Sequence, residues 1–166
     1  AVGTSSSSSA SNSVTPATTP DAPTSLTPTA GNAQVALSWT APFVNGGSTL
    51  TDYVIEYKLT SEPTTWSIFS DGTSTSTSGT VTSLTNGSSY DFRVSAVNAV
   101  GQGSASATAT ATPVTVPGAP TSASATAGNA QASVAFSAPA SNGGSAITSY
   151  TVTSSPGNFT GTGSAS

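Results

Sequence analysis

The chain has 166 residues, of which 5% are charged and 34% are hydrophobic, and its formal net charge at pH 7 is −4. With only two basic residues, it lacks the positive surface that binding to nucleic acid or to an anionic membrane requires. It also has no apolar run long enough for membrane insertion. Cysteine, histidine and methionine are absent, which excludes disulfides, thiol chemistry and the usual zinc ligands. The charge-poor composition, rich in serine and threonine, indicates an extracellular or cell-surface location.

The first 19 residues allow two interpretations. They contain a run of five serines, Ser5–Ser9, which is typical of a flexible or O-glycosylated linker. However, Ala1-Val2-Gly3 and the later Thr15-Pro16 echo Ala99-Val100-Gly101 and Thr112-Pro113. Residues 1–19 are therefore expected to be either a linker or the last strand of a preceding sandwich.

Residues 20–113 are predicted to form one complete all-β domain. Pro20-Asp21-Ala22-Pro23 is a stiff boundary, because neither proline can enter a central strand. Alternating apolar and polar residues and turn signals then predict strands at about 25–29, 34–40, 51–59, 66–69, 81–84, 90–96 and 105–112. The most buried side chains are expected to be Trp39, Tyr53, Ile55, Leu84, Tyr90, Phe92 and Val94, followed by Val35, Leu37 and Tyr57.

The charged residues of two strands predict how those strands pair. If Ile55 lies opposite Val94 in an antiparallel pair, Glu56 faces Arg93 and Lys58 faces Asp91 on the solvent side. Such pairs add little stability. They favour one register, since a slip by one residue would turn every side chain to the wrong face.

The turn before the predicted strand 90–96 carries a family resemblance. Leu84 stands six residues before Tyr90 with Asn86-Gly87 between them, as in the tyrosine corner of β-sandwiches, where the phenol binds upstream backbone. Together with Trp39 on an earlier strand, this segment resembles fibronectin type III domains, especially those strung along bacterial extracellular proteins. The resemblance implies an immunoglobulin-like β-sandwich in which strands A, B and E pack on strands C′, C, F and G.

A second copy of the pattern begins at Pro117-Gly118-Ala119-Pro120 and follows the first at a constant spacing of 97 residues. Ala127–Gln131 repeats Ala30–Gln34, Phe136 replaces Trp39, and Asn142-Gly143-Gly144-Ser145 repeats Asn45-Gly46-Gly47-Ser48. Long copies without gaps are a strong repeat signal. We therefore expect tandem fibronectin type III sandwiches, one complete and one truncated, with residues 114–166 supplying strands A, B, C and C′ of the second.

The incomplete copy is not expected to fold stably alone, because the counterparts of its strands E and F carry much of the core. It should be completed either by more of a longer array or by a neighbouring copy through strand complementation.

No catalytic, cofactor-binding or metal-binding residue is predicted. The acids lie on outward strand positions or in loops, and Asp52, Asp71 and Asp91 lack a calcium-loop spacing. Trp66 could stack on a sugar, but packing as part of a strand is the preferred interpretation. Asn86-Gly87-Ser88 and Asn158-Phe159-Thr160 fit the glycosylation pattern, but for Asn86 the preferred interpretation is a turn residue before the tyrosine corner.

The leading functional hypothesis is a non-catalytic structural spacer, stalk or filament-forming segment of a secreted or cell-surface protein. Its partners would be neighbouring repeats or other copies of itself. The alternative is an accessory module that binds polysaccharide or another surface on behalf of an extracellular enzyme or adhesin. An exposed row of aromatic side chains would favour the alternative.

Overall fold

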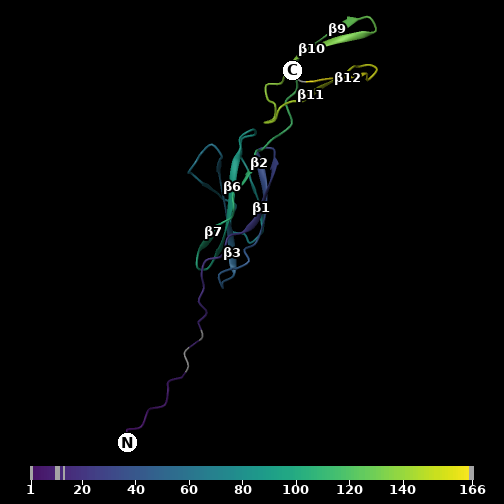
Figure 1. Ribbon diagram of the computed structural model, residues 1–166. Helices are drawn as coiled ribbons and strands as arrows, with labels where there is room; N and C mark the ends of the chain where they lie inside the picture. Colours follow the sequence, from purple (N-terminus) through teal and green to yellow (C-terminus); the bar gives the residue numbers. More distant parts are fainter. Residues whose placement is uncertain (1, 10–11, 13, 165–166) are drawn as a thin grey trace.

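The computed structural model describes residues 2–9, 12 and 14–164, and the chain is drawn out lengthwise, with a sandwich in its middle (Figure 1). The described residues form strands, turns and loops without any helix. The strands are β1 (Thr24–Gly31), β2 (Gln34–Thr40), β3 (Leu50–Leu59), β4 (Ser67–Phe69), β5 (Ser78–Val81), β6 (Tyr90–Asn98), β7 (Gln102–Ala105), β8 (Ala109–Ala111), β9 (Thr121–Gly128), β10 (Gln131–Ser137), β11 (Ser149–Thr153) and β12 (Thr160–Ser164).

Strands β1 to β8 make two antiparallel sheets, which we call the complete sandwich. One sheet has the order β1-β2-β5 and the other β4-β3-β6-β7, with β8 also paired to β6. This is the division into A-B-E and C′-C-F-G that the sequence resemblance implied. The all-β prediction is therefore confirmed.

The core lies between these sheets and consists mainly of the predicted residues. The buried hydrophobic side chains are Val35, Leu37, Trp39, Tyr53, Ile55, Val81, Leu84, Tyr90, Phe92, Val94 and Ala96. Trp39 and Tyr53 meet edge to face with ring centres 5.3 Å apart, and burial raises the pKa of the Tyr53 phenol. Tyr57 was expected close behind this group but is only partly buried at its edge.

The strand register agrees with the prediction from charge pairing. In the β3–β6 pair, Ile55 lies opposite Val94 and Glu56 opposite Arg93. Two residue pairs beyond Glu56 and Arg93, Lys58 lies opposite Asp91. The alternation of apolar and charged residues therefore identified both the faces and the pairing of the two central strands.

The tyrosine corner is also present. The backbone N–H of Thr85 donates to the Tyr90 hydroxyl at 3.1 Å. Asn86 acts in the same turn, because its Oδ1 accepts from the N–H of Ala33 and its Nδ2 donates to Asn32, both at 2.8 Å. Asn86 therefore ties the turn before β6 to the β1–β2 turn, which supports its interpretation as a turn residue.

The prediction of one continuous last strand over residues 105–112 is wrong. It divides into β7 and β8 because the side chain of Ser106 replaces a ladder contact. The Val94 N–H donates to Ser106 Oγ at 3.1 Å, and Ser106 Oγ donates to the Ala107 carbonyl at 3.0 Å. Ser106 is buried, so its hydroxyl satisfies backbone groups inside the break.

Two short strands also differ from their predicted limits. Trp66 lies outside β4, Ile68 is largely exposed, and Phe69 instead packs against the core. Strand β5 begins before Val81, and Leu84 follows it in a loop although its side chain is buried. In such short segments the alternation pattern contains too few residues to locate a strand end.

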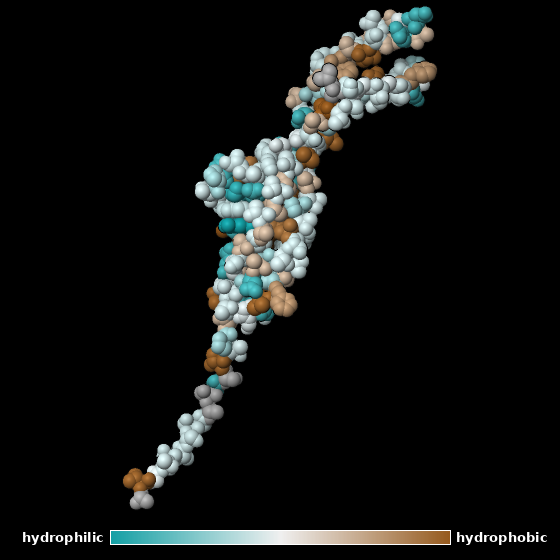
Figure 2. Space-filling view, viewed as in Figure 1, coloured by the Kyte–Doolittle hydropathy of each residue, from teal (hydrophilic) through white to brown (hydrophobic). Residues whose placement is uncertain are grey.

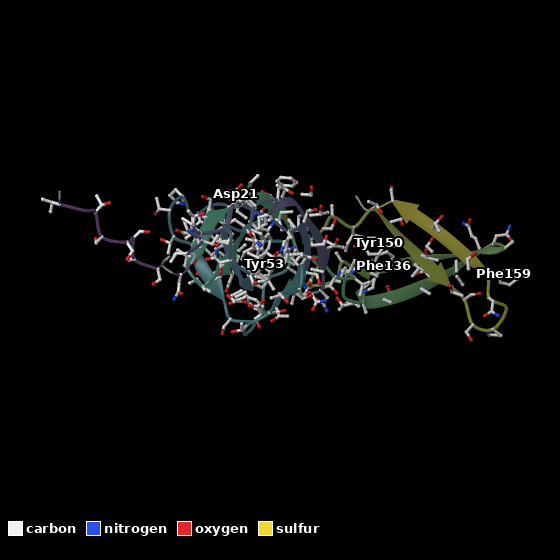
Figure 3. All side chains as sticks on the ribbon, turned by 90° about the horizontal axis from the view of Figure 1, so that it is seen from below. Asp21, Tyr53, Phe136, Tyr150 and Phe159 are labelled. Atoms are coloured by element: carbon white, nitrogen blue, oxygen red, sulfur yellow. The ribbon has the colours of Figure 1, made fainter. Side chains whose placement is uncertain are left out.

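The C-terminal region contains two separate hairpins, β9–β10 and β11–β12. Phe136 and Tyr150 lie side by side (Figure 3), with ring centres 4.7 Å apart. Hydrophobic residues gather between the hairpins (Figure 2), where an open groove is lined by Ala132, Val134, Phe136, Tyr150, Val152 and Phe159, among others. Strands β9, β10 and β11 stand where the repeat places strands A, B and C, whereas β12 begins four residues before the counterpart of β4. The assignment of residues 114–166 to half of a second sandwich stays a prediction.

The described residues before Pro20 are exposed and form no strand. Ala1 and residues 10, 11 and 13, which belong to the predicted segment 1–19, lie outside the described residues, as do residues 165–166. The linker and preceding-strand interpretations both stay predictions.

Candidate functional site

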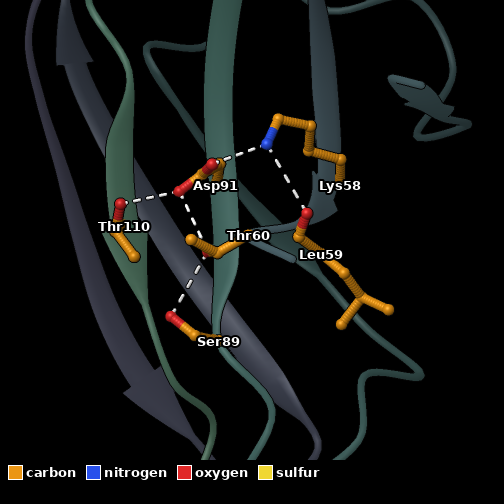
Figure 4. A network of polar contacts seen from close by, with 6 residues as sticks. All are labelled: Lys58, Leu59, Thr60, Ser89, Asp91 and Thr110. Carbon is orange, nitrogen blue, oxygen red and sulfur yellow. Dashed lines mark hydrogen bonds and ion pairs between the residues drawn. The ribbon is translucent and has the colours of Figure 1, made fainter. Parts of the chain in front are cut away.

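The outer face of the β3–β6 pair carries a charged network (Figure 4). Lys58 Nζ lies 2.8 Å from Asp91 Oδ2, and the other carboxylate oxygen accepts from Thr110 at 2.8 Å and Thr60 at 3.1 Å. The hydrogen bond from Lys58, followed by the one from Thr110, lowers the pKa of the Asp91 carboxyl. A carboxylate held in its ionised form by three donors is suited to a structural role and poorly suited to proton transfer.

Glu56 and Arg93 form the second pair on this face. Arg93 donates from Nε and Nη2 to the two carboxylate oxygens of Glu56, both at 2.9 Å. The guanidinium also covers Trp66, with its central carbon 4.2 Å from the ring centre, while Lys58 Nζ lies 5.4 Å away. Trp66 was predicted as a strand packing residue, but it is a platform for these cations. Its ring is therefore not free to stack on a sugar from that side.

The remaining acid singled out near this sheet is structural. Asp52 Oδ1 accepts from the backbone N–H groups of Tyr53 and Ser74, each at 2.9 Å. Across the residues that the structure describes, no group of three or more His, Cys, Asp and Glu side chains could hold a metal ion. Nor does any helix in that part of the chain have the length and apolar character to cross a membrane.

A second candidate site is the joint where the chain enters a sandwich. At the first joint, Thr18 N donates to the Gly46 carbonyl at 2.8 Å and Asp21 N to the Val44 carbonyl at 3.0 Å. At the second joint, the residues 97 positions later make the same two bonds. They run from Thr115 to Gly143 at 2.7 Å and from Gly118 to Ser141 at 2.9 Å. The entering chain is thus bound to the same loop in both copies.

Glycine is required in this loop for two reasons. Gly46 and Gly143 have φ angles of +72° and +74°, which side chains other than glycine rarely adopt. A Cβ atom would also overlap the carbonyl of Thr18 or Thr115. The repeated Asn-Gly-Gly-Ser sequence was recognised only as a loop, although its complete repetition was the signal that could have identified the joint.

Asn98 clamps the first joint, a role that no pattern in the sequence indicated. Its Nδ2 donates to the carbonyls of Thr18 at 2.7 Å and Asn45 at 2.9 Å. Its Oδ1 accepts from the N–H of Val100 at 2.8 Å. The buried amide therefore links the entering chain to the loops on both sides of it.

The complete sandwich meets the C-terminal region through its tyrosine-corner turn. Gly87 N donates to the Pro113 carbonyl at 2.8 Å, and Val114 N donates to the Gly31 carbonyl at 3.1 Å. A Cβ on Gly87 would lie 3.1 Å from Gly144 Cα, so two glycine backbones touch. The crevice beside them is lined by Asn86, Gly87, Ser88, Pro139, Ala140, Ser141, Asn142 and Gly144.

The two-sheet strand order and the tyrosine corner together define an immunoglobulin-like β-sandwich. The sequence pattern of the fibronectin type III domain matches residues 21–112, more than half of the chain. The chain therefore belongs to the fibronectin type III family.

Solved structures of two multidomain proteins resemble it. Domains A168–A170 of titin share 32% sequence identity with a TM-score of 0.54, over 58% of this chain and 32% of theirs. The twitchin kinase region of C. elegans shares 30% identity with a TM-score of 0.52, over 60% of this chain and 18% of its own. The chain thus spans about a third or less of each of these two structures.

Proposed function

We propose that this chain is a non-catalytic structural spacer, a segment of a stalk or filament built from head-to-tail β-sandwich repeats. The observation that carries the proposal is the joint. The entering chain makes the same pair of backbone hydrogen bonds to the same glycine-containing loop at two places 97 residues apart. A repeated connection of this kind serves the spacing and orientation of successive units.

The geometry of the joint favours extension. Residues 14–19 enter the complete sandwich at one end, and the C-terminal region leaves from the opposite end (Figure 1). A head-to-tail contact of this type is heterologous, and such contacts continue into open arrays unless the rotation closes a ring. Each further repeat would therefore lengthen the molecule.

The charged residues support a structural role as well. The cations Lys58 and Arg93 are paired with Asp91 and Glu56, so they serve the cohesion of one sheet. Arg93 covers the Trp66 ring that could have stacked on a sugar, which weakens the alternative of a carbohydrate-binding module.

We place this spacer outside the cell or on its surface. The support is the composition, which has 5% charged residues and is rich in serine and threonine, and the resemblance to the repeats of bacterial extracellular proteins. The titin and twitchin structures give no support to this part of the proposal. The proposed partners are neighbouring repeats, or other copies whose strands would cover the open groove between β9–β10 and β11–β12.

Small-angle X-ray scattering of the chain would test the proposal, with Gly143→Ala as the joint variant. We expect an elongated particle for the natural chain and a broader range of shapes for Gly143→Ala, because the added Cβ would overlap the Thr115 carbonyl. Gly163→Ala is the matched control, since no atom lies within 4 Å of a Cβ at that position.

A compact particle, or equal scattering from both variants, would contradict the spacer. Titration with soluble polysaccharides tests the alternative. Saturable binding that Trp66→Ala abolishes would replace the spacer with a carbohydrate-binding module.

A further inference from the structure

One end of the complete sandwich exposes hydrophobic side chains. Phe43 is 101% exposed and Val44 is 46% exposed, and Val100 in the neighbouring loop is 52% exposed. The loop that carries Phe43 and Val44 is anchored to the entering segment, because the Val44 carbonyl accepts from the Asp21 N–H at 3.0 Å. Hydrophobic residues gather at this end, beside the entering segment (Figure 2). An exposed aromatic ring on an anchored loop indicates a contact surface.

The second repeat shows what lies at the corresponding place. Phe43 corresponds, 97 residues later, to Ala140. Ala140 lines the crevice in which the C-terminal region meets the turn Asn86–Ser88 of the sandwich before it. Position 43 therefore faces the place that a preceding sandwich would occupy.

The glycines of the two loops give the same result independently. Gly144 is partly covered, and the atoms nearest to its added Cβ would be those of Asn86 and Gly87. Its counterpart Gly47 is exposed, and the described atoms within 4 Å of a Cβ added there belong to Pro16 and Ala17 of the entering segment. The two joints share their hydrogen bonds, but only the second has a sandwich turn resting on the loop.

We infer that the loop Phe43–Gly47 is the acceptor half of a joint between repeats, and that its partner is the Asn86–Ser88 turn of a preceding copy of this domain. This inference rests on the proposed function as a spacer. In the joint, Phe43 fills the crevice that Ala140 leaves partly open in the second repeat, and Gly47 meets Gly87 of the preceding copy. The end carrying Phe43 and the end carrying Gly87 are thus complementary halves of one contact.

The difference between the two loops has a consequence for the array. A phenylalanine removes far more apolar surface from water than an alanine at the same position. The joint in front of the complete sandwich is therefore expected to hold its orientation more firmly than the joint at Ala140. Phe43 is exposed in the present chain because its partner in the joint is the Asn86–Ser88 turn of another copy.

The test uses the full chain with a second copy of residues 17–113 inserted directly after Pro113. This insertion preserves the 97-residue spacing. Position 17 then follows Pro113 as Val114 does in the natural sequence. Because the chain has no cysteine, Ala36→Cys in each copy provides two labelling sites on an exposed strand position. Pulsed electron paramagnetic resonance then measures the distance distribution between the two copies.

We expect a narrow distribution that broadens when Phe43→Ser is placed in the second copy. Phe43→Ser in the first copy, which has no sandwich before it, is the internal control and should leave the distribution unchanged. A single chain carrying Phe43→Ser should unfold at the same denaturant concentration as the natural chain, since the ring is fully exposed.

Two outcomes would overturn the inference, and they differ from failure of the spacer. A narrow distribution that survives Phe43→Ser in the second copy leaves the array intact but removes Phe43 from its joint. A broad distribution in the duplicated chain itself shows that no fixed joint forms. If the natural chain also scatters as a compact particle, the proposed function fails together with the inference.

Discussion

Arg93 is held by two partners at once, with its guanidinium carbon 4.2 Å from the Trp66 ring centre and its Nε 2.9 Å from Glu56 Oε2. The carboxylate occupies the edge of the guanidinium and the indole its face, which are separate binding surfaces of the same cation. The Arg93 side chain is 31% exposed, so water weakens both contacts. The arrangement fixes the side chain more than it adds stability.

This arrangement predicts a small coupling between Trp66 and Arg93. A double-mutant cycle with Trp66→Ala and Arg93→Ala should give an interaction free energy of about 0.5–1 kcal/mol in urea unfolding. Trp66→Phe is the matched control and should retain part of the coupling, because its ring still presents an aromatic face. A coupling free energy of zero would remove Trp66 as a partner of the cation.

Truncation of Trp39 should destabilise the complete sandwich strongly. Trp39→Ala is expected to lower the free energy of unfolding by about 3–5 kcal/mol, because it leaves a cavity beside Tyr53 and Ile55. Trp39→Phe should cost clearly less, since Trp39 Nε1 has no hydrogen-bond partner among the described residues and the second repeat carries Phe136 at this place. Equal losses for the two variants in urea unfolding would contradict the packing explanation.

The tyrosine corner should contribute through one hydrogen bond. Tyr90→Phe removes the acceptor of the Thr85 N–H, and we expect a loss of about 0.5–1.5 kcal/mol. Tyr57→Phe is the control on the same sheet, because the Tyr57 hydroxyl makes no hydrogen bond to the described residues. Amide hydrogen exchange at Thr85 should accelerate in Tyr90→Phe alone, and an unchanged rate would argue against the bond.

Asp91 should make stability depend on acid pH. Its pKa in the folded chain lies below the ordinary value of 3.8, chiefly because Lys58 donates to the carboxylate. The stabilisation is therefore complete above that value and is lost as the pH falls through the folded-state pKa. The difference in unfolding free energy between the natural chain and Asp91→Asn should be constant near neutral pH and shrink below about pH 4. If this difference grew on acidification, the predicted direction of the pH dependence would be wrong.

Much of the complete sandwich could be predicted because its central strands repeat a simple pattern. In the strand from Tyr90, every second side chain is apolar and the charges between them match those of the strand ending at Leu59. Burial of one face and attraction across the other both require the same register, so two independent effects agree. The same reasoning located the tyrosine corner, where sequence spacing and backbone geometry are directly linked.

Features that depend on single polar contacts outside the alternation pattern could not be predicted in this way. The break at Ser106 exists because a hydroxyl reaches the backbone of Val94, and the position of Trp66 depends on a cation 27 residues away. Neither contact changes the local alternation of residue types. A sequence pattern reports which side chains prefer water, but it does not report which polar groups will meet.

The amino-acid sequence by itself determined the sandwich, its core, the register of its central strands and the 97-residue repeat. Only the tertiary structure decided that the Asn-Gly-Gly-Ser loop binds the entering chain, that Asn98 clamps it, and that Phe43 stands exposed beside it. The physical reason is the kind of interaction. Burial of apolar side chains acts on one strand at a time, and alternation reveals it. The joint consists of backbone hydrogen bonds and glycine contacts, which any residue's backbone could make and which become specific only when the folded chain brings the two loops together.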